Sequence, residues 1–383
     1  MSISWILIIT VALFLLQHQL FARWGFRGLR IERAFSTTHC HAGDDIVMIE
    51  TIVNRKLAPI PWLRLESTIH AGLHFAKMSN LAVSSGALFQ NHRSLFSLMP
   101  YTKIVRRHGV HCAKRGWYKL ETVAASMGDL VGVQAASSIH RMQLELLVYP
   151  RLVSRDDIPL LSSRWQGDIT VKRWIMPDPF LVSGAREYRF GDTMNSIHWK
   201  ATARSQKLQV YNRDFTADPR LLLAVNTQIT ETMWDAVTDP ELVEKALSYA
   251  ATLAEYAVSQ GIPVGFGYNG SLQGQPGVPV YLAPEGGWPH LEHLFETMAK
   301  LAISCSRSFE DFLDHGIEQE GNAMDIILLT SFVSKGIEES IVRLESLGHS
   351  VFIIPLQHGL LELNGEEVGV SNVNAYSNAF STN

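Results

Sequence analysis

The chain has 383 residues, of which 46% are hydrophobic and 18% are charged, with a formal net charge of −4. The charged fraction is below the ~25% of an average soluble protein, which predicts large buried cores. The mildly acidic balance argues against a nucleic-acid-binding protein, because such proteins usually carry a basic domain.

The N-terminal stretch predicts a membrane anchor. Residues 3–16 are apolar apart from Ser4 and Thr10, and extension to Ala22 gives the roughly 20 residues that cross a bilayer as a helix. No positive charge precedes this run and no small-residue cleavage site follows it, so an anchor is favoured over a cleaved signal or a buried helix. Positive charges follow it at once, and they predict a single pass with the bulk of the chain in the cytoplasm: Arg23, Arg27, Arg30 and Arg33.

The anchor and its basic flank occupy residues 1–33, and residues 34–150 are predicted to form β-structure. Residues 44–54 and 61–70 alternate apolar and polar side chains, which is typical of half-buried strands. Pro59 and Pro61 mark a loop between them. Several short strands separated by regular turns indicate a β-sandwich-like domain.

Residues 219–360 show a different rhythm, in which strands and helices alternate. Residues 221–225 are a short apolar run of the kind that is buried on both faces of a sheet. Residues 242–257 carry apolar side chains at helical spacing, and Gly261 ends the predicted helix. We expect a mostly parallel sheet covered by helices, and therefore an α+β multidomain chain. Residues 151–218 are expected to form a linker that includes the segment 184–215, and residues 361–383 are expected to form a polar tail.

The segment 184–215 carries six basic and three acidic side chains, a local charge of +3 among aromatic residues. Asp192 is expected to cap a short helix, on which Lys200 and Arg204, four residues apart, share a face. Arg186 can form paired hydrogen bonds with a carboxylate. Four interpretations stay open: an internal ion network, a docking surface for an acidic protein, an anion site, and a catalytic site.

Other motifs favour structural roles. Gly265–Gly270 matches Gly-x-Gly-x-x-Gly, but no helix follows it, so a strand entering a hairpin is favoured over a dinucleotide site. The chain has no P-loop and no nucleophile elbow. Cys305 lacks an evident base and is expected to be a small core residue. Metal binding is disfavoured for three further groups: His39–Cys40–His41, His108 with His111 and Cys112, and His290 with His293. Because the three cysteines lie far apart, they favour a reducing compartment.

The segment 184–215 resembles the signature of the domain of unknown function 58 (DUF58) family. The resemblance rests on the following residues: Gly184, Arg186, Glu187, Tyr188, Gly191, Asp192, Ile197, Trp199, Lys200, Ala203, Arg204, Leu208 and Val210. It implies a membrane-anchored protein whose C-terminal unit is a Rossmann-like, von Willebrand factor A-like domain. It also implies a partnership with a MoxR-type AAA+ ATPase. Many members of the family have two membrane helices, whereas this chain shows one.

Von Willebrand A domains often hold a divalent cation through carboxylates after the first strand and after a later strand. The matching positions here carry only neutral side chains: Asn226, Gln228, Thr230 and Ser331. Hard cations prefer anionic oxygen ligands, so the resemblance implies a degenerate metal site.

Together these observations predict a non-enzymatic scaffold or adaptor, anchored in a bacterial inner membrane through residues 3–22. We expect it to dock a protein partner, with no cofactor and no nucleic acid. The partner-binding or structural residues would be Arg186, Glu187, Tyr188, Gly191, Asp192, Trp199, Lys200 and Arg204. The alternative is a hydrolytic enzyme that acts through Asp192, His198 and Lys200.

Overall fold

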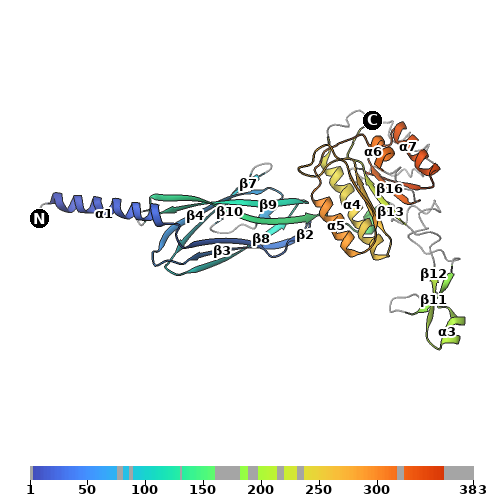
Figure 1. Cartoon of the computed structure of the whole chain (residues 1–383), viewed down its shortest axis with the longest axis horizontal. Coiled ribbons are helices and arrows are strands. Elements are labelled where there is room, and N and C mark those ends of the chain that lie inside the picture. The colour runs from blue at the N-terminus through green and yellow to red at the C-terminus, as the bar shows by residue number, and fades with distance from the viewer. Residues whose placement is uncertain are drawn as a thin grey trace, which may run out of the picture. The chain divides into compact units, whose positions relative to one another are not determined.

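In a computed structural model of the chain (Figure 1), the described residues are 3–75, 81–85, 89–129, 132–159, 182–188, 197–213, 220–230, 237–316 and 323–357. The chain divides into two compact units. The first comprises Met1–Arg151 with Phe295–Lys300, and the second comprises Leu152–Leu294 with Leu301–Asn383. The polar tail, residues 361–383, lies outside the described residues.

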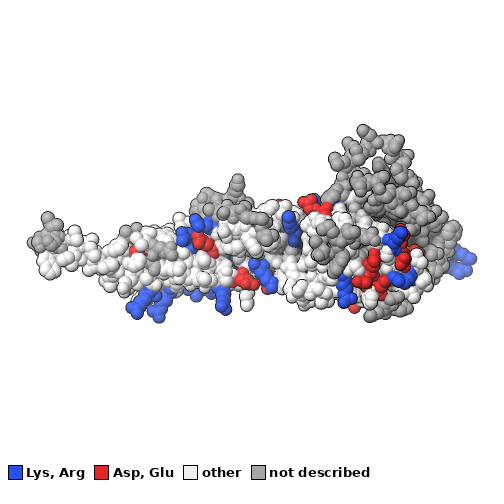
Figure 2. Space-filling view, turned by 90° about the horizontal axis from the view of Figure 1, so that it is seen from above, with Lys and Arg blue, Asp and Glu red and all other residues white. Residues whose placement is uncertain are grey.

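The first unit begins with the helix α1, Ile3–Trp24. The stretch Trp5–Trp24 is long and apolar enough to cross a membrane, as the sequence predicted. The side chains from Trp5 to Leu16 are exposed, whereas Gln17 and His18 are half-buried. In Figure 2 most of α1 shows neither acidic nor basic atoms. Its apolar surface is therefore not covered by the described protein.

Two sheets follow α1. The four-stranded sheet has the order β1 (Leu29–Phe35), β3 (Asp45–Asn54), β8 (Lys103–Cys112) and β5 (Leu73–Phe75). The six-stranded sheet has the order β2 (His39–His41), β10 (Gln134–Tyr149), β9 (Gly116–Gly128), β4 (Ile60–His70), β7 (Phe89–Leu98) and β6 (Leu81–Ser85). All their pairings are antiparallel except that of β2 with β10. The first strand begins at Leu29, inside the segment that we had assigned to the basic flank of the anchor.

The two sheets pack face to face over two apolar clusters. One cluster contains Met48 and Val110 from the four-stranded sheet and Ile69 and Leu146 from the six-stranded sheet. The other contains Ile52 with side chains of β4, β7 and β9. Glu50 lies on β3 between Met48 of the first cluster and Ile52 of the second, and it is only 1% exposed. The core of this sandwich is therefore interrupted by a charged layer.

This charged layer consists of Arg33, Glu50, Ser67, His92 and His108. Arg33 Nε donates to Glu50 Oε1 over 2.7 Å, and Arg33 NH1 donates to Ser67 Oγ over 2.9 Å. His108 Nε2 lies 3.5 Å from Glu50 Oε2. Burial raises the pKa of Glu50, but His108 and the Arg33 guanidinium outweigh it and hold that pKa below its ordinary value. Burial, with the charges of Arg33 and His108, lowers the pKa of His92 to about 4.

Residues of the second unit form a five-stranded sheet with the order β15 (Val280–Glu285), β14 (Val264–Tyr268), β13 (Leu221–Val225), β16 (Asp325–Thr330) and β17 (Ser350–Pro355). All neighbours are parallel except the edge pair β14 and β15. Every residue of β13 and β14 is buried, which explains their continuous apolar sequence. The Gly265–Gly270 stretch accordingly enters an antiparallel pairing, as predicted.

Four helices accompany this sheet: α4 (Pro240–Ser259), α5 (Trp288–Ala299), α6 (Phe309–Gly316) and α7 (Lys335–Ser346). Side chains of α6 and α7 share one apolar cluster with β13 and β16, and Figure 1 shows α4 and α5 on the other side. Asp239 caps α4, with Pro240 as its first residue, and Ser334 caps α7. The short helix α6 was not predicted from the sequence.

Candidate functional site

The predicted motif folds as a hairpin that encloses a short helix. The strand β11, Val182–Glu187, pairs antiparallel with β12, Gln209–Arg213. Between them lies α3, Trp199–Ser205. Ile197 bridges Val210, and both side chains are buried, with exposures of 4% and 0%. This bridge therefore joins the chain just before α3 to β12.

One side of this motif is exposed. Trp199 is 68% exposed and Tyr188 is 37% exposed. Lys200 and Arg204, one helical turn apart on α3, are exposed as well. We call Tyr188, Trp199, Lys200 and Arg204 the α3 surface. Tryptophan, tyrosine and arginine, three of the four residue types on this surface, are enriched at protein interfaces.

The start of α3 corrects one prediction. The helix begins at Trp199, and its N-cap is His198, whose Nδ1 accepts from the Ala201 amide over 3.2 Å. Asp192 was expected to cap this helix, but it lies seven residues before Trp199, too far to act as the cap. Gly191 and Asp192, with the side chains of Arg186 and Glu187, lie outside what the structure describes.

The His198 cap also bears on the hydrolase alternative. The Nδ1 lone pair of His198 is engaged by the Ala201 amide, so it is not available to accept a proton from a nucleophile. His198 would have to give up the helix cap before it could act as a general base.

A second cluster of polar side chains lies at the carboxyl edge of the sheet in the second unit, where the strand order reverses at β13. Asn226 Nδ2 donates to Thr330 Oγ1 over 3.0 Å, and Asn226 Oδ1 accepts from the Gln228 amide over 2.9 Å and from Asn269 Nδ2 over 3.3 Å. Asn269 Oδ1 accepts from the amide and the hydroxyl of Thr227, over 2.8 and 2.9 Å. We call these five residues the amide network.

All five members of the amide network are at most 5% exposed, and none is charged. Ser331 Oγ adds hydrogen bonds to the carbonyls of Gln228 and Ile229. The structure thus brings Asn226, Gln228 and Ser331 together, whereas Thr230 is exposed. Sequence reasoning missed Thr227, Asn269 and Thr330. Asn269 directly follows β14, so its place at the same edge of a parallel sheet was the available signal.

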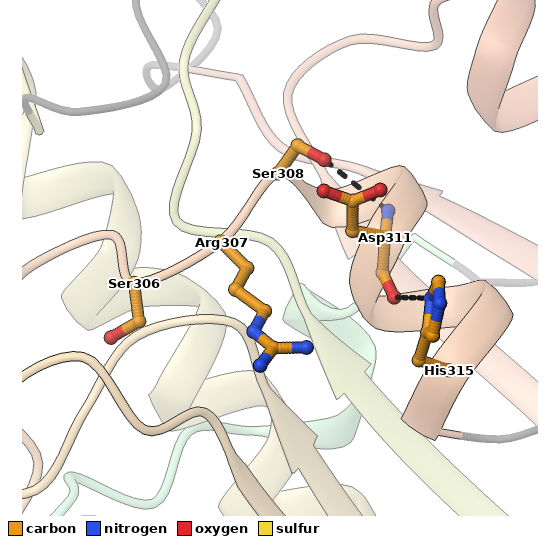
Figure 3. A pocket seen from close by; sticks show the side chains of 5 residues that line it. All are labelled: Ser306, Arg307, Ser308, Asp311 and His315. Atoms are coloured by element: carbon orange, nitrogen blue, oxygen red, sulfur yellow. Dashed lines mark hydrogen bonds between the residues drawn. The ribbon is translucent and has the colours of Figure 1, made fainter.

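An open pocket of about 530 Å³ lies close to the amide network, because its lining residue Arg307 accepts a hydrogen bond from Asn269 at the main-chain carbonyl. It is lined by Ser306, Arg307, Ser308, Asp311 and His315 (Figure 3). The Asp311 amide donates to Ser308 Oγ over 3.2 Å, and His315 Nδ1 lies 3.1 Å from the Asp311 carbonyl. Among the described residues neither serine hydrogen-bonds to His315, so the described lining pairs no nucleophile with a base. Because the lining includes both the basic Arg307 and the acidic Asp311, it does not favour a ligand of either charge.

The remaining candidates occupy structural positions. His290 Nε2 lies 2.8 Å from the Val264 carbonyl, and His39 stacks on Tyr149. Cys305 is half-buried rather than a core residue, and its thiol donates to the Arg307 carbonyl over 3.0 Å. The thiols of Cys40 and Cys112 are buried 3.4 Å apart. Within the described residues, no three His, Cys, Asp or Glu side chains are placed to hold a metal ion.

Comparison with known proteins finds a match to the DUF58 family in one part of this mixed α/β chain. Residues 184–356 match the family model described as "Protein of unknown function DUF58". This match begins in β11 and ends just after β17, so it includes the α3 surface and the amide network. The chain is also 19% identical over 298 residues to the "Uncharacterized protein YeaD" of Bacillus subtilis (strain 168), which covers 78% of this chain and 68% of that protein.

Solved structures show only weak likeness. A non-cellulosomal cohesin from Archaeoglobus fulgidus is 12% identical, covering 30% of this chain and 89% of its own, with a TM-score of 0.20. A cohesin module from a family 33 glycoside hydrolase of Clostridium perfringens is 10% identical, covering 30% and 95%, with a TM-score of 0.21. At TM-scores this low, neither likeness carries an argument about fold or function.

Proposed function

We propose that this chain is a non-enzymatic adaptor, anchored in a bacterial inner membrane by α1, with its two units in the cytoplasm. The anchor proposal is supported by the apolar helix and by the arginines that follow it. The adaptor proposal is carried by one observation, the exposed Trp199 on a short helix that also exposes Lys200 and Arg204. Tryptophan and arginine are the residue types that most often dominate binding energy at interfaces.

The charge of the α3 surface indicates the kind of partner. Lys200 and Arg204 are the charged members of this surface, and both are positive. Complementary charge steers association and suppresses wrong partners, so the partner should present carboxylates. The resemblance to DUF58 proteins extends this proposal to a MoxR-type AAA+ ATPase as the partner.

We further propose that residues 219–360 form a Rossmann-like domain of the von Willebrand A type. The strand order β15-β14-β13-β16-β17, with β15 antiparallel at the edge, supports this proposal. The amide network lies where such a domain would place its cation ligands. Its oxygens already accept hydrogen bonds from amides and hydroxyls, which supports a site that functions without metal.

The adaptor proposal is tested by binding of the full-length chain in membranes to a co-expressed MoxR-type ATPase from the same genome. Trp199→Ala should weaken binding about 30-fold, the effect of losing about 2 kcal/mol at a central aromatic residue. Lys200→Glu with Arg204→Glu should abolish co-purification. The matched control is Arg107→Glu with Arg141→Glu, which reverses two exposed charges of β8 and β10.

The same variants separate docking from a purely structural role. Trp199 is so exposed that its replacement by alanine should change the free energy of unfolding by less than about 0.5 kcal/mol. A large fall in melting temperature, with partner binding retained, would show that the motif is an internal tie and not a docking surface. Turnover of a substrate by the wild type would instead favour the hydrolase alternative.

A further inference from the structure

The helix α1 is fastened to the sandwich by a buried carboxylate. Asp129, in the turn between β9 and β10, has a side-chain exposure of 0%. Its Oδ2 accepts from Gln17 Nε2 over 3.3 Å and lies 3.0 Å from His18 Nδ1. Its Oδ1 accepts from the Val133 amide over 2.9 Å. The turn therefore lies beside α1 at the level of Gln17, not at the end of the helix.

This contact falls inside the stretch that is long enough to cross a membrane. That stretch is Trp5–Trp24, and it includes Gln17 and His18. A helix rises about 1.5 Å per residue, so Gln17 lies roughly 10 Å along the axis from Trp24. The interfacial layer of one leaflet is only about 5–7 Å thick. With Trp24 at the interface, Asp129 and Val133 beside Gln17 would reach the edge of the hydrocarbon.

The described residues of this turn have the properties expected of a segment at the edge of the hydrocarbon. Val133 is apolar and 48% exposed. The Gly132 amide donates to the Asp129 carbonyl over 3.1 Å, and the Gly132 carbonyl accepts from Trp62 Nε1 over 3.2 Å. Polar backbone groups that face lipid must be bonded within the protein. Here the carboxylate of Asp129 is bonded as well, so the buried polar groups of the turn face protein.

A rim of apolar and basic side chains surrounds the end of α1. Its loops are tied to the residues after the helix: Lys56 Nζ donates to the Gly25 carbonyl, and the Arg55 amide donates to the Gly28 carbonyl over 2.8 Å. The Tyr101 amide in turn donates to the Lys56 carbonyl over 3.3 Å. The rim consists of exposed side chains from these segments: Arg23, Trp24, Arg27, Arg55, Leu57, Met99, Tyr101 and Lys103.

The composition of this rim fits one occupant. Leu57, Met99 and Tyr101 are 75%, 68% and 69% exposed, so they offer apolar surface that lipid could cover. The other members are an aromatic residue and four cations, which suit the headgroup layer of an anionic leaflet. Figure 2 shows basic atoms where α1 meets the sandwich, with others farther along it. Continuity with the anchor favours lipid over a second protein.

We propose that this end of the sandwich is a lipid-binding surface. Asp129, Gly132 and Val133, the described residues of the turn between β9 and β10, reach the leaflet beside α1, and the rim contacts anionic headgroups. The inference rests on the proposed anchoring by α1, and it adds that the sandwich is seated in the membrane surface and not suspended below it. The surface would fix the orientation of the sandwich relative to the membrane.

The test uses the full-length chain in proteoliposomes of phosphatidylcholine, with or without phosphatidylglycerol. An environment-sensitive fluorophore is attached at Val133→Cys, at Tyr101→Cys, or at Thr37→Cys in the loop at the other end of β1. All three carry Cys305→Ser, because Cys305 is the half-buried native thiol. A nitroxide on the lipid acyl chain should quench most of the fluorescence at position 133 and none at position 37.

The headgroup contacts are tested at position 101. Its probe should be less accessible to an aqueous quencher in vesicles that contain phosphatidylglycerol, and Arg55→Glu with Lys103→Glu should remove that dependence. Full aqueous exposure of position 133 in protein that floats with the vesicles would overturn the proposal while leaving the anchor intact. Position 133 shielded from water but not quenched by lipid nitroxide would also overturn it, in favour of a protein contact. Failure to float would refute the anchor itself.

Discussion

The sandwich and the C-terminal sheet both contain a buried polar cluster, but the two are built from different chemistry. The charged layer of the sandwich joins a guanidinium to a carboxylate, and several of its atoms have no hydrogen-bond partner among the described residues: Glu50 Oε2, His92 Nε2 and both ring nitrogens of His108. The amide network contains no charge, and its two asparagines bond to each other and to their neighbours.

This difference in chemistry determines whether the stability of each cluster depends on pH and on the loss of a single charge. A buried ion pair gains from its partners but loses the hydration of both charges, so its stability depends on keeping every member in the correct protonation state. A network of amides and hydroxyls has nothing to titrate near neutral pH, and its hydrogen bonds are independent of salt and metal. The sandwich should therefore be sensitive to pH and to single charge removal, and the sheet should not.

The largest effect is expected from removal of the carboxylate in the charged layer. Glu50→Leu would leave Arg33, whose side chain is 3% exposed, with Ser67 as its bonded partner in the layer. Breaking a buried pair in this way costs about 3–5 kcal/mol, measured as the free energy of unfolding of the sandwich in urea. The double variant Arg33→Met with Glu50→Leu should recover most of that loss. A single variant as stable as the wild type would contradict a charged layer.

Acidification should weaken the sandwich by a similar amount. Burial holds the pKa of His92 at about 4, below the 6.5 of a free imidazole. The unfolded chain therefore binds this proton first, and stability falls as the pH decreases from about 6.5 towards 4. A difference of about 2.5 pKa units corresponds to about 3 kcal/mol. The lowered pKa of Glu50 adds a loss of the same sign at still lower pH.

His92→Phe is the matched variant for this dependence. Phenylalanine cannot titrate, and the His92 ring already packs against Phe75 with 4.3 Å between ring centroids. Unfolding followed at several pH values should show a flatter profile between pH 6.5 and 4 for the variant. An identical slope in both proteins would assign the acid sensitivity to other groups.

The two clusters also differ in how far the sequence reveals them. Alternation along 44–54 predicts β3 and places Glu50 on its inward face, but Arg33, His92 and His108 lie on three other strands. Only the register of those strands brings them together. Asn226 and Gln228 of the amide network, with the neighbouring Ser331, were selected in advance through the resemblance to von Willebrand A domains, whereas Thr227, Asn269 and Thr330 were not.

Local signals explain the remaining differences. The longer helices and the buried strands were predicted because their apolar spacing is sustained over many residues. The eight-residue helix α6 is too short for such a pattern to stand out. The start of α3 was misplaced because Asp192 is a common capping residue and His198 is not. The exposure of Trp199 was not predictable, since sequence does not show which face of a seven-residue helix is covered.

The smallest effect is expected when divalent cations are added to the amide network. An intact cation site holding magnesium or calcium at about 100 times its dissociation constant would stabilise the domain by about 2.7 kcal/mol. Here Asn226 and Asn269 are 1% and 0% exposed and their oxygens accept hydrogen bonds from the protein, and among the described residues no carboxylate joins them. Thermal unfolding of chelator-treated protein should therefore be unchanged when either ion is added. A rise in melting temperature that is absent in Asn226→Leu would show that these neutral oxygens bind the ion. The two clusters would then differ only in whether their side chains are charged, and not in whether they respond to solution conditions.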